Sequence, residues 1–231
     1  MYVPPVDLYG PIHKGLRWAF ARVLSRIGST TVTDDAAVVE VLGEVNDLVI
    51  GIEGHLAHEE AFIHPAIEAR RPGATAGLVD DHVEHANMLG AVRVLLAAIR
   101  SGSATTRPAL WRALYLCFAD LFAENITHMA EEEEVIQPLL EELYTPGELR
   151  EIEGRLIASI APDEMLAAMK IMLPGNDLAF RLHMLNGAKH ALPPEVFAGL
   201  FAQATVHLAP SEIEALAVKL LRNASVPAAA A

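Results

Sequence analysis

Three short segments of this chain indicate how it folds: HLAHEE at residues 55–60, HVEH at 82–85 and HMAEE at 128–132. Each pairs a histidine with a second possible metal ligand about one helical turn later, so that both lie on one helix face. His13 adds another imidazole near the N-terminus. Imidazoles and carboxylates from four separate helical segments suit an iron pair or a zinc ion. They predict a metal bound in the middle of a helix bundle.

The composition favours an all-α protein and excludes several functional classes. The chain has 231 residues, of which 52% are hydrophobic, and this length can bury a sizeable core. The net charge of −13 argues against nucleic-acid binding, which needs a basic face. We find no apolar run of about 18 residues, so we expect no membrane partner. The single cysteine, Cys117, and an N-terminus without signal-peptide features predict a cytoplasmic protein.

Helix start and stop signals predict four long helices and no strands. The helices cover about residues 11–27, 35–70, 75–100 and 107–144, and Pro-Gly pairs follow the second and the fourth. Short turns between long helices favour antiparallel neighbours, so we predict an up-down four-helix bundle. Pro138 predicts a local kink in the fourth helix.

The remainder of the chain has a different pattern. We expect residues 1–145 to form the bundle and residues 146–226 to form a smaller C-terminal helical unit of about five short, proline-punctuated segments. The Ala-rich residues 227–231 are expected to be a disordered tail. No motif assigns a role to residues 146–226.

The hydrophobic stripe of each long helix passes through the candidate ligands. The predicted inward positions are His13, Leu16, Phe20, Val23 and Ile27; Val38, Val41, Val45, Leu48, Ile52, His55, Glu59 and Phe62; Leu78, His82, His85, Leu89, Val92, Leu96 and Ile99; and Trp111, Leu114, Phe118, Leu121, Asn125, His128, Glu132, Val135 and Leu139. The histidines and carboxylates among them fall in one slab roughly 15 Å deep at ~1.5 Å per residue. Burying each without a partner would cost roughly 1–3 kcal/mol, and a bound metal removes that cost.

Other titratable side chains near these stripes are less clearly assigned. His58 lies at the edge of its stripe, where it either supports a ligand or packs, and His64 is expected to project away to solvent or to pack near Pro65. Four carboxylates are expected to form a solvated acidic face: Glu60, Glu131, Glu133 and Glu134. Glu131 and Glu133 remain rivals of Glu132, because helix distortion at a metal site changes which carboxylate reaches inward.

Residues 7–145 resemble the hemerythrin-like, or HHE, cation-binding domain. The matching features are His13, His55-x-x-x-Glu59 with Glu60 and Pro65, His82, and His128-x-x-x-Glu132. In hemerythrins a four-helix bundle binds a non-heme di-iron centre, and one iron keeps an open position for dioxygen. The resemblance therefore implies two iron ions in a centre of the Fe–O–Fe type. It implies terminal ligands at His13, His55, His82, His85 and His128, and bridging carboxylates at Glu59 and Glu132.

The chain departs from the oxygen-carrying hemerythrins at two points. Those proteins place the third-helix histidines four residues apart, whereas His82 and His85 are three apart. They also have an Asp five residues after the last histidine, where this chain has Glu132 at four and Glu133 at five. Both differences resemble the broader HHE group, whose members include iron and oxygen sensors.

Three classes of function are consistent with this sequence. The first is a di-iron protein that binds or senses dioxygen or another small diatomic ligand, or senses or stores iron, with the C-terminal unit as an output or homodimerisation module. The second is a di-iron enzyme acting on peroxide or nitric oxide, which we expect less because no proton-delivery residue is evident. The third is a non-redox protein that holds zinc or another divalent metal, because these ligands accept several metals.

Overall fold

The computed structural model describes residues 6–223, and within this range every regular element is a helix. The chain divides into two compact units. Of the described residues, one unit contains 6–10 and Ala19–Ile160, and the other contains Pro11–Trp18 and 161–223. The first helix is continuous and contributes to both units. The predicted all-α class is confirmed, and none of the described helices is long and apolar enough to cross a bilayer.

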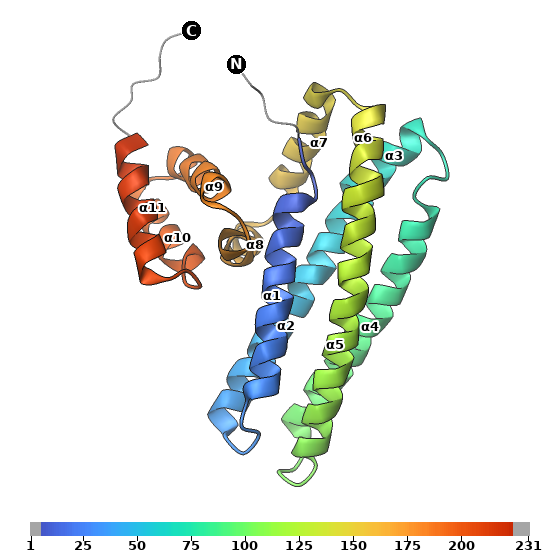
Figure 1. Cartoon of the computed structure of the whole chain (residues 1–231), viewed down its shortest axis with the longest axis vertical. Helices are drawn as coiled ribbons and strands as arrows, with labels where there is room; N and C mark the ends of the chain where they lie inside the picture. The colour runs from blue at the N-terminus through green and yellow to red at the C-terminus, as the bar shows by residue number, and fades with distance from the viewer. Residues whose placement is uncertain (1–5, 224–231) are drawn as a thin grey trace. The chain divides into compact units, whose positions relative to one another are not determined.

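Four long helical segments form the bundle (Figure 1). They are α1 (Gly10–Ser29); α2 (Asp35–His58) with η1 (Glu59–Ile63) and α3 (His64–Arg70); α4 (Ala76–Ser101); and α5 (Arg107–Glu131) with η2 (Glu132–Ile136) and α6 (Gln137–Leu143). Each predicted helix is therefore present within a few residues of its expected ends. The segments η1 and η2 are π-helical turns inside otherwise α-helical rods.

Contacts between aromatic rings and polar groups fix the bundle helices against one another. The Phe20 ring of α1 lies 5.6 Å from Phe118 and 5.0 Å from Phe122 on α5, measured between centroids. The Trp111 indole N–H of α5 donates a hydrogen bond to the carbonyl of Ile27 at 2.9 Å. At the start of α2 the Asp34 carboxylate accepts hydrogen bonds from two backbone N–H groups, as a helix N-cap does.

The predicted hydrophobic stripe of α4 is fully buried. In the second and fourth long helical segments, the buried positions lie one residue later than predicted after Glu59 and Glu132. On α4 every predicted inward residue from Leu78 to Ile99 is buried. On the fourth rod the predicted Val135 is 55% exposed and Ile136 is buried instead. On the second rod Ile63 is buried in place of Phe62, which is only partly buried. A π turn contains one extra residue, so each stripe moves on by one position.

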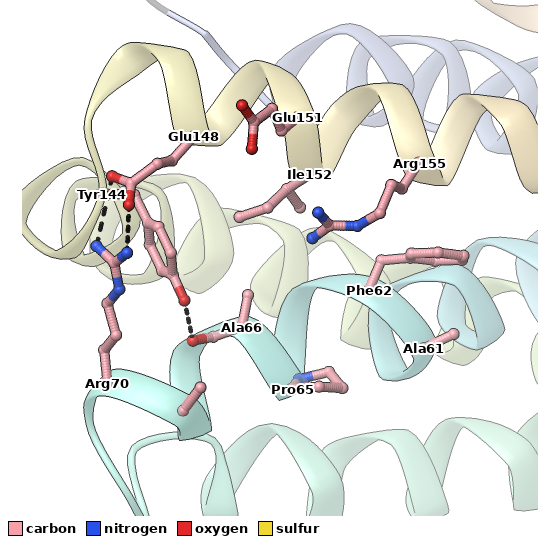
Figure 2. A pocket seen from close by; sticks show the side chains of 11 residues that line it. Ala61, Phe62, Pro65, Ala66, Arg70, Tyr144, Glu148, Glu151, Ile152 and Arg155 are labelled. Atoms are coloured by element: carbon pink, nitrogen blue, oxygen red, sulfur yellow. Dashed lines mark hydrogen bonds and ion pairs between the residues drawn. The ribbon is translucent and has the colours of Figure 1, made fainter.

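The unit that holds the bundle extends past the predicted boundary at 145 and includes α7 (Pro146–Ser159). Leu149 and Ile152 of α7 pack in one apolar cluster with residues such as Ile63 and Ile136. Arg70 pairs with Glu148, and the Tyr144 hydroxyl donates to the carbonyl of Ala66 at 2.6 Å (Figure 2). The stripe displaced by the π turns supplies the apolar surface that α7 covers, which explains the later boundary.

The second unit contains α8 (Pro162–Gly175), α9 (Leu178–Ala191), α10 (Pro194–Ala204) and α11 (Pro210–Asn223). Its core includes Leu173, Leu185 and Leu216. The start of α1 packs tightly on α8, because a Cβ added at Gly175 would lie 2.6 Å from the carbonyl oxygen of Lys14. The predicted tail at 227–231 lies outside the described residues.

Candidate metal centre

Six of the seven predicted ligands form two groups that share their carboxylates. One group contains His13, His55, Glu59 and Glu132, and the other contains Glu59, His82, His128 and Glu132. Within each group the possible ligand atoms all lie within 4.8 Å of one another. Each group therefore offers two imidazoles together with the same two carboxylates.

Burial is nearly complete at these side chains. His13 and Glu132 are 0% exposed, and Glu59 is 1% exposed. His82 and His128 are 3% and 5% exposed, and the His55 side chain is 11% exposed. Acidic groups are almost never buried to this degree unless they are paired or bind a cation. Imidazole and carboxylate groups from several helices are thus concentrated in the buried interior of the bundle.

The two π turns begin at the two buried carboxylates. Glu59 is the first residue of η1 and its carbonyl accepts the N–H of His64, five residues later. Glu132 is the first residue of η2 and its carbonyl accepts the N–H of Gln137 in the same way. A proline lies in the first turn of the α-helix that follows each π turn, where its missing N–H is tolerated. Such turns occur frequently at functional sites because they redirect side chains.

The Glu59 carboxylate contacts histidines of both groups with different oxygens. Its Oε1 lies 3.1 Å from Nε2 of His55, and its Oε2 lies 3.5 Å from Nε2 of His82. In the second group, Oε2 of Glu132 lies 3.5 Å from Nε2 of His128. A carboxylate that presents one oxygen to each of two histidine pairs has the arrangement that a bridge between two cations requires.

Burial strongly perturbs the protonation of the centre. It raises the pKa of Glu59 well above the ordinary value, and the charge and hydrogen bond of Glu132 raise it further. Burial also raises the pKa of Glu132 to about 8, against a lowering by its hydrogen bond with Glu59. Burial lowers the pKa of His128 to about 3, so its imidazole is neutral near pH 7. Burial thus favours the protonated forms of these carboxylates, and a bound cation would favour their ionised forms.

Two outer carboxylates lie beside the histidines of the second group, and Glu60 is within hydrogen-bond distance of His82. Nδ1 of His82 lies 3.0 Å from Oε1 of Glu60, and Nδ1 of His128 lies 3.5 Å from Oδ2 of Asp81. Such partners fix the ring orientation of a metal-binding histidine and leave Nε2 for the metal. Glu60 is exposed, as predicted for a solvated acidic face, and its carboxylate also lies next to His82. Asp81 was missed, although it directly precedes His82 in the sequence.

The seventh predicted ligand, His85, lies beside the second group and outside both groups. It is 3% exposed, and its ring centroid is 4.7 Å from that of His128. Its Nδ1 has no hydrogen-bond partner among the described residues. The three-residue spacing turns His85 toward α5 relative to His82. A ligand role for His85 stays a prediction.

The remaining titratable side chains, whose roles the sequence did not assign clearly, differ in how deeply they are buried. Glu131 and Glu134 are exposed and Glu133 is partly buried, so Glu132 is the buried carboxylate of this segment. His58 is partly buried and its ring lies 6.5 Å from that of Phe62. His64 was expected to point away but is only 5% exposed, with its ring 4.9 Å from that of His82. The π turn explains this inward position, because it rotates the residues that follow Glu59.

Tyr9 is a further component that the sequence patterns did not reveal. Its side chain is 0% exposed, and its hydroxyl is buried. Burial, and then the charges of Glu59 and Glu132, raise the pKa of this phenol. Tyr9 precedes α1 and falls outside any helical periodicity, so the counting that found the ligands could not find it. It places an O–H group close to the two carboxylates.

The residues present fit a cation site. Nε2 of His82 and Nε2 of His128 are buried and have no hydrogen-bond partner among the described residues, which is expected for nitrogen atoms that bind a metal. The donor set of imidazoles and carboxylates suits iron, zinc and related divalent metals. A separate cavity of about 510 Å³ lies between α3 and α7 (Figure 2). Its lining includes Arg70 and Arg155 and none of the candidate ligands.

The fold and this side-chain set define a helical-bundle protein with a buried cation site rich in nitrogen and oxygen donors. The family model for the hemerythrin HHE cation binding domain matches residues 5–140, which is more than half of the chain. The chain therefore belongs to the hemerythrin HHE family, as its motifs predicted. Comparisons with curated proteins and with solved structures gave no significant match.

Proposed function

We propose that this protein binds two metal ions, with iron as the physiological metal, and that Glu59 and Glu132 bridge them. The observation that supports this most strongly is the pair of overlapping groups, in which two histidine pairs share the same two buried carboxylates. A mononuclear site would need one such group and would leave the other buried without a cation. His13 and His55 would hold one ion, and His82 and His128 the other.

The donor set also favours binding of a small ligand. Two histidines with a carboxylate form the set through which non-heme Fe(II) keeps positions open for small molecules. Iron bound in this way would supply reversible binding or redox chemistry. The protein residues bury the site, and the histidine and carboxylate side chains of the two groups would hold the ions there. We therefore propose that the protein binds or senses dioxygen or a related diatomic molecule, or that it senses or stores iron.

The remaining sequence-based expectations fit this role as further proposals. The C-terminal helices α8 to α11 are a candidate output or homodimerisation module. A cytoplasmic location stays a prediction from the single cysteine and the N-terminal sequence. The strong negative charge of the chain supports partners that are not nucleic acids.

A redox enzyme acting on peroxide or nitric oxide is the second candidate, and Tyr9 favours it. Its buried phenol lies close enough for the charges of Glu59 and Glu132 to raise its pKa, so it offers a proton at the carboxylate pair. General acid groups of this kind assist reactions in which a bound oxygen atom must be protonated. Steady turnover of peroxide or nitric oxide that falls in a Tyr9→Phe variant with full metal content would favour this function over binding.

Metal analysis of the purified full-length chain tests the main proposal. We expect about two iron ions per chain after anaerobic reconstitution with Fe²⁺, and an absorption spectrum that changes reversibly with dioxygen. Stoichiometric zinc together with a failure to take up iron would remove the iron proposal. One metal per chain at saturation, whatever its identity, would remove the bridging role of the carboxylates.

A further inference from the structure

A second cavity opens beside the metal centre on the surface between α4 and α5. It measures about 140 Å³ and its lining comprises Asp81, Glu84, His85, Glu124, Thr127, His128 and Glu131. Lys and Arg are absent from this lining. Two of the lining residues, His85 and His128, belong to the buried imidazole cluster. The cavity thus joins an acidic surface to the histidines inside the bundle.

Helical spacing explains why the acidic groups gather here. Glu124, Thr127 and Glu131 lie on one face of α5, because residues three, four and seven apart share a face. Asp81 and Glu84 lie on one face of α4 in the same way. We call Asp81, Glu84, Glu124 and Glu131 the acidic mouth. None of these four belongs to either ligand group.

The imidazoles at the inner end of the cavity point to a cation as its ligand. His85 is 3% exposed, and its Nδ1 has no hydrogen-bond partner among the described residues. Nδ1 of His128 lies 3.5 Å from the Asp81 carboxylate of the mouth. The rings of His85 and His128 both line the cavity, so imidazole groups face it beneath the carboxylates. A carboxylate rim with imidazole nitrogens beneath it suits a divalent transition metal.

We propose that the acidic mouth is the uptake route of the metal centre and holds a divalent transition-metal ion transiently, with His85 passing it to His128. This inference rests on the proposed metal-binding function. An acidic mouth raises the local concentration of cations and accelerates their binding by electrostatic steering. It explains why His85 is buried beside the second group without being part of it. The remaining ligands then receive the ion from the side of His128.

A pair of substitutions in the acidic mouth tests whether its charges speed up metal binding without changing the fold. Glu84 and Glu124 are exposed, so Glu84→Gln with Glu124→Gln removes two charges and leaves the fold intact. The matched control is Asp80→Asn with Asp120→Asn, which removes two exposed charges from the same helices outside the cavity. The probe is Co²⁺ alone, added to the metal-free full-length chain in a stopped-flow instrument. Bound Co²⁺ is followed by its absorbance, and the final content is measured after gel filtration.

We expect the mouth variant to load Co²⁺ roughly tenfold more slowly than the control at low ionic strength. The difference should shrink in about 1 M salt, because screening removes steering between exposed charges. The final Co²⁺ content should equal that of the wild type. Equal loading rates in the mouth variant and the control would overturn the uptake route and leave the metal centre in place. Absence of any Co²⁺ or Fe²⁺ uptake by the wild-type chain would instead remove the proposed function, and this inference with it.

Discussion

The segments 55–65 and 128–138 share one pattern, His-x-x-x-Glu-x-x-x-Ile-x-Pro, and place it in different surroundings. In both, the chain changes from an α to a π turn at the glutamate, and the isoleucine four residues later is buried. The histidine, the glutamate and the buried isoleucine therefore occur in equivalent positions in both segments. The residue before the proline differs: it is His64 in the first segment and Gln137 in the second.

The residues before the two prolines make different contacts, which gives the two segments different roles. The Gln137 side chain accepts a hydrogen bond from the N–H of Leu8 at 3.1 Å and donates one to the carbonyl of Val6 at 2.8 Å. It thereby holds the segment that carries Tyr9. The His64 ring lies beside His82, and its buried Nε2 has no hydrogen-bond partner among the described residues. One copy stabilises the N-terminal segment, and the other adds a further imidazole beside the centre.

Removal of one bridging charge should have the largest effect. Glu59→Gln and Glu132→Gln keep the side-chain shape, and we expect metal content to fall from about two ions per chain to less than one, because each carboxylate serves both groups. The metal-free variants should melt at a higher temperature than the metal-free wild type, because an amide avoids the burial of an ionisable acid. Elemental analysis and thermal melts measure both. Full metal content in both variants would show that neither carboxylate bridges.

Removal of one π turn should have a smaller effect on the metal and little on the fold. Deletion of the exposed Ala61 takes one residue from η1, so the rod closes as a continuous α-helix and Ile63 stays on the buried stripe. We expect metal binding to weaken roughly ten- to a hundredfold because Glu59 is misdirected. Deletion of the exposed Glu134 in η2 is the matched change. Unchanged affinity in both, with unchanged helix content by circular dichroism, would separate the π turns from the site.

The π turns also mark the limit of what the sequence predicts. On α4 the helical period is constant, so counting from Leu78 to Ile99 identified every buried residue, including His82. After Glu59 and Glu132 the same counting selected Phe62 and Val135, because nothing in a constant period signals the extra residue. The shared spacing of the two segments, with an isoleucine and a proline after each glutamate, was the available signal. Tyr9 and Asp81 contact the centre from outside the stripes, so only the tertiary structure reveals them.

Replacement of the residue before each proline by leucine tests whether the two segments differ in their role in stability. Gln137→Leu removes two hydrogen bonds to the backbone of the N-terminal segment, and we expect it to lower the free energy of unfolding by roughly 1–3 kcal/mol. His64→Leu removes a buried nitrogen that lacks a partner, so it should destabilise the metal-free protein less than Gln137→Leu. Urea denaturation of both metal-free variants measures this. A larger loss in His64→Leu would show that His64 has a structural role comparable to that of Gln137.

The smallest effect concerns the turn that follows the first segment. The Glu68 side chain accepts hydrogen bonds from Gly73 N–H at 2.7 Å, and from the N–H and hydroxyl of Thr75 at 2.9 and 2.7 Å. Gly73 has φ of +84°, a conformation that favours glycine, and these hydrogen bonds hold the turn in which it lies. The hydroxyl of Thr75 and then the two backbone N–H groups lower the pKa of Glu68 from 4.5 to about 2.

This lowered pKa fixes the sign of the pH dependence. The folded state favours the ionised form of Glu68, so its contribution to stability is present above pH 4.5 and is lost as the pH falls toward about 2. The melting temperature of metal-free Glu68→Gln should therefore lie below that of the wild type at neutral pH, and the difference should vanish toward pH 2. Thr75→Val removes the first donor and so raises the folded-state pKa of Glu68; the loss should therefore be smaller and be complete at a higher pH than in the wild type. An equal difference at neutral and acidic pH would show that the ionised carboxylate does not hold this turn.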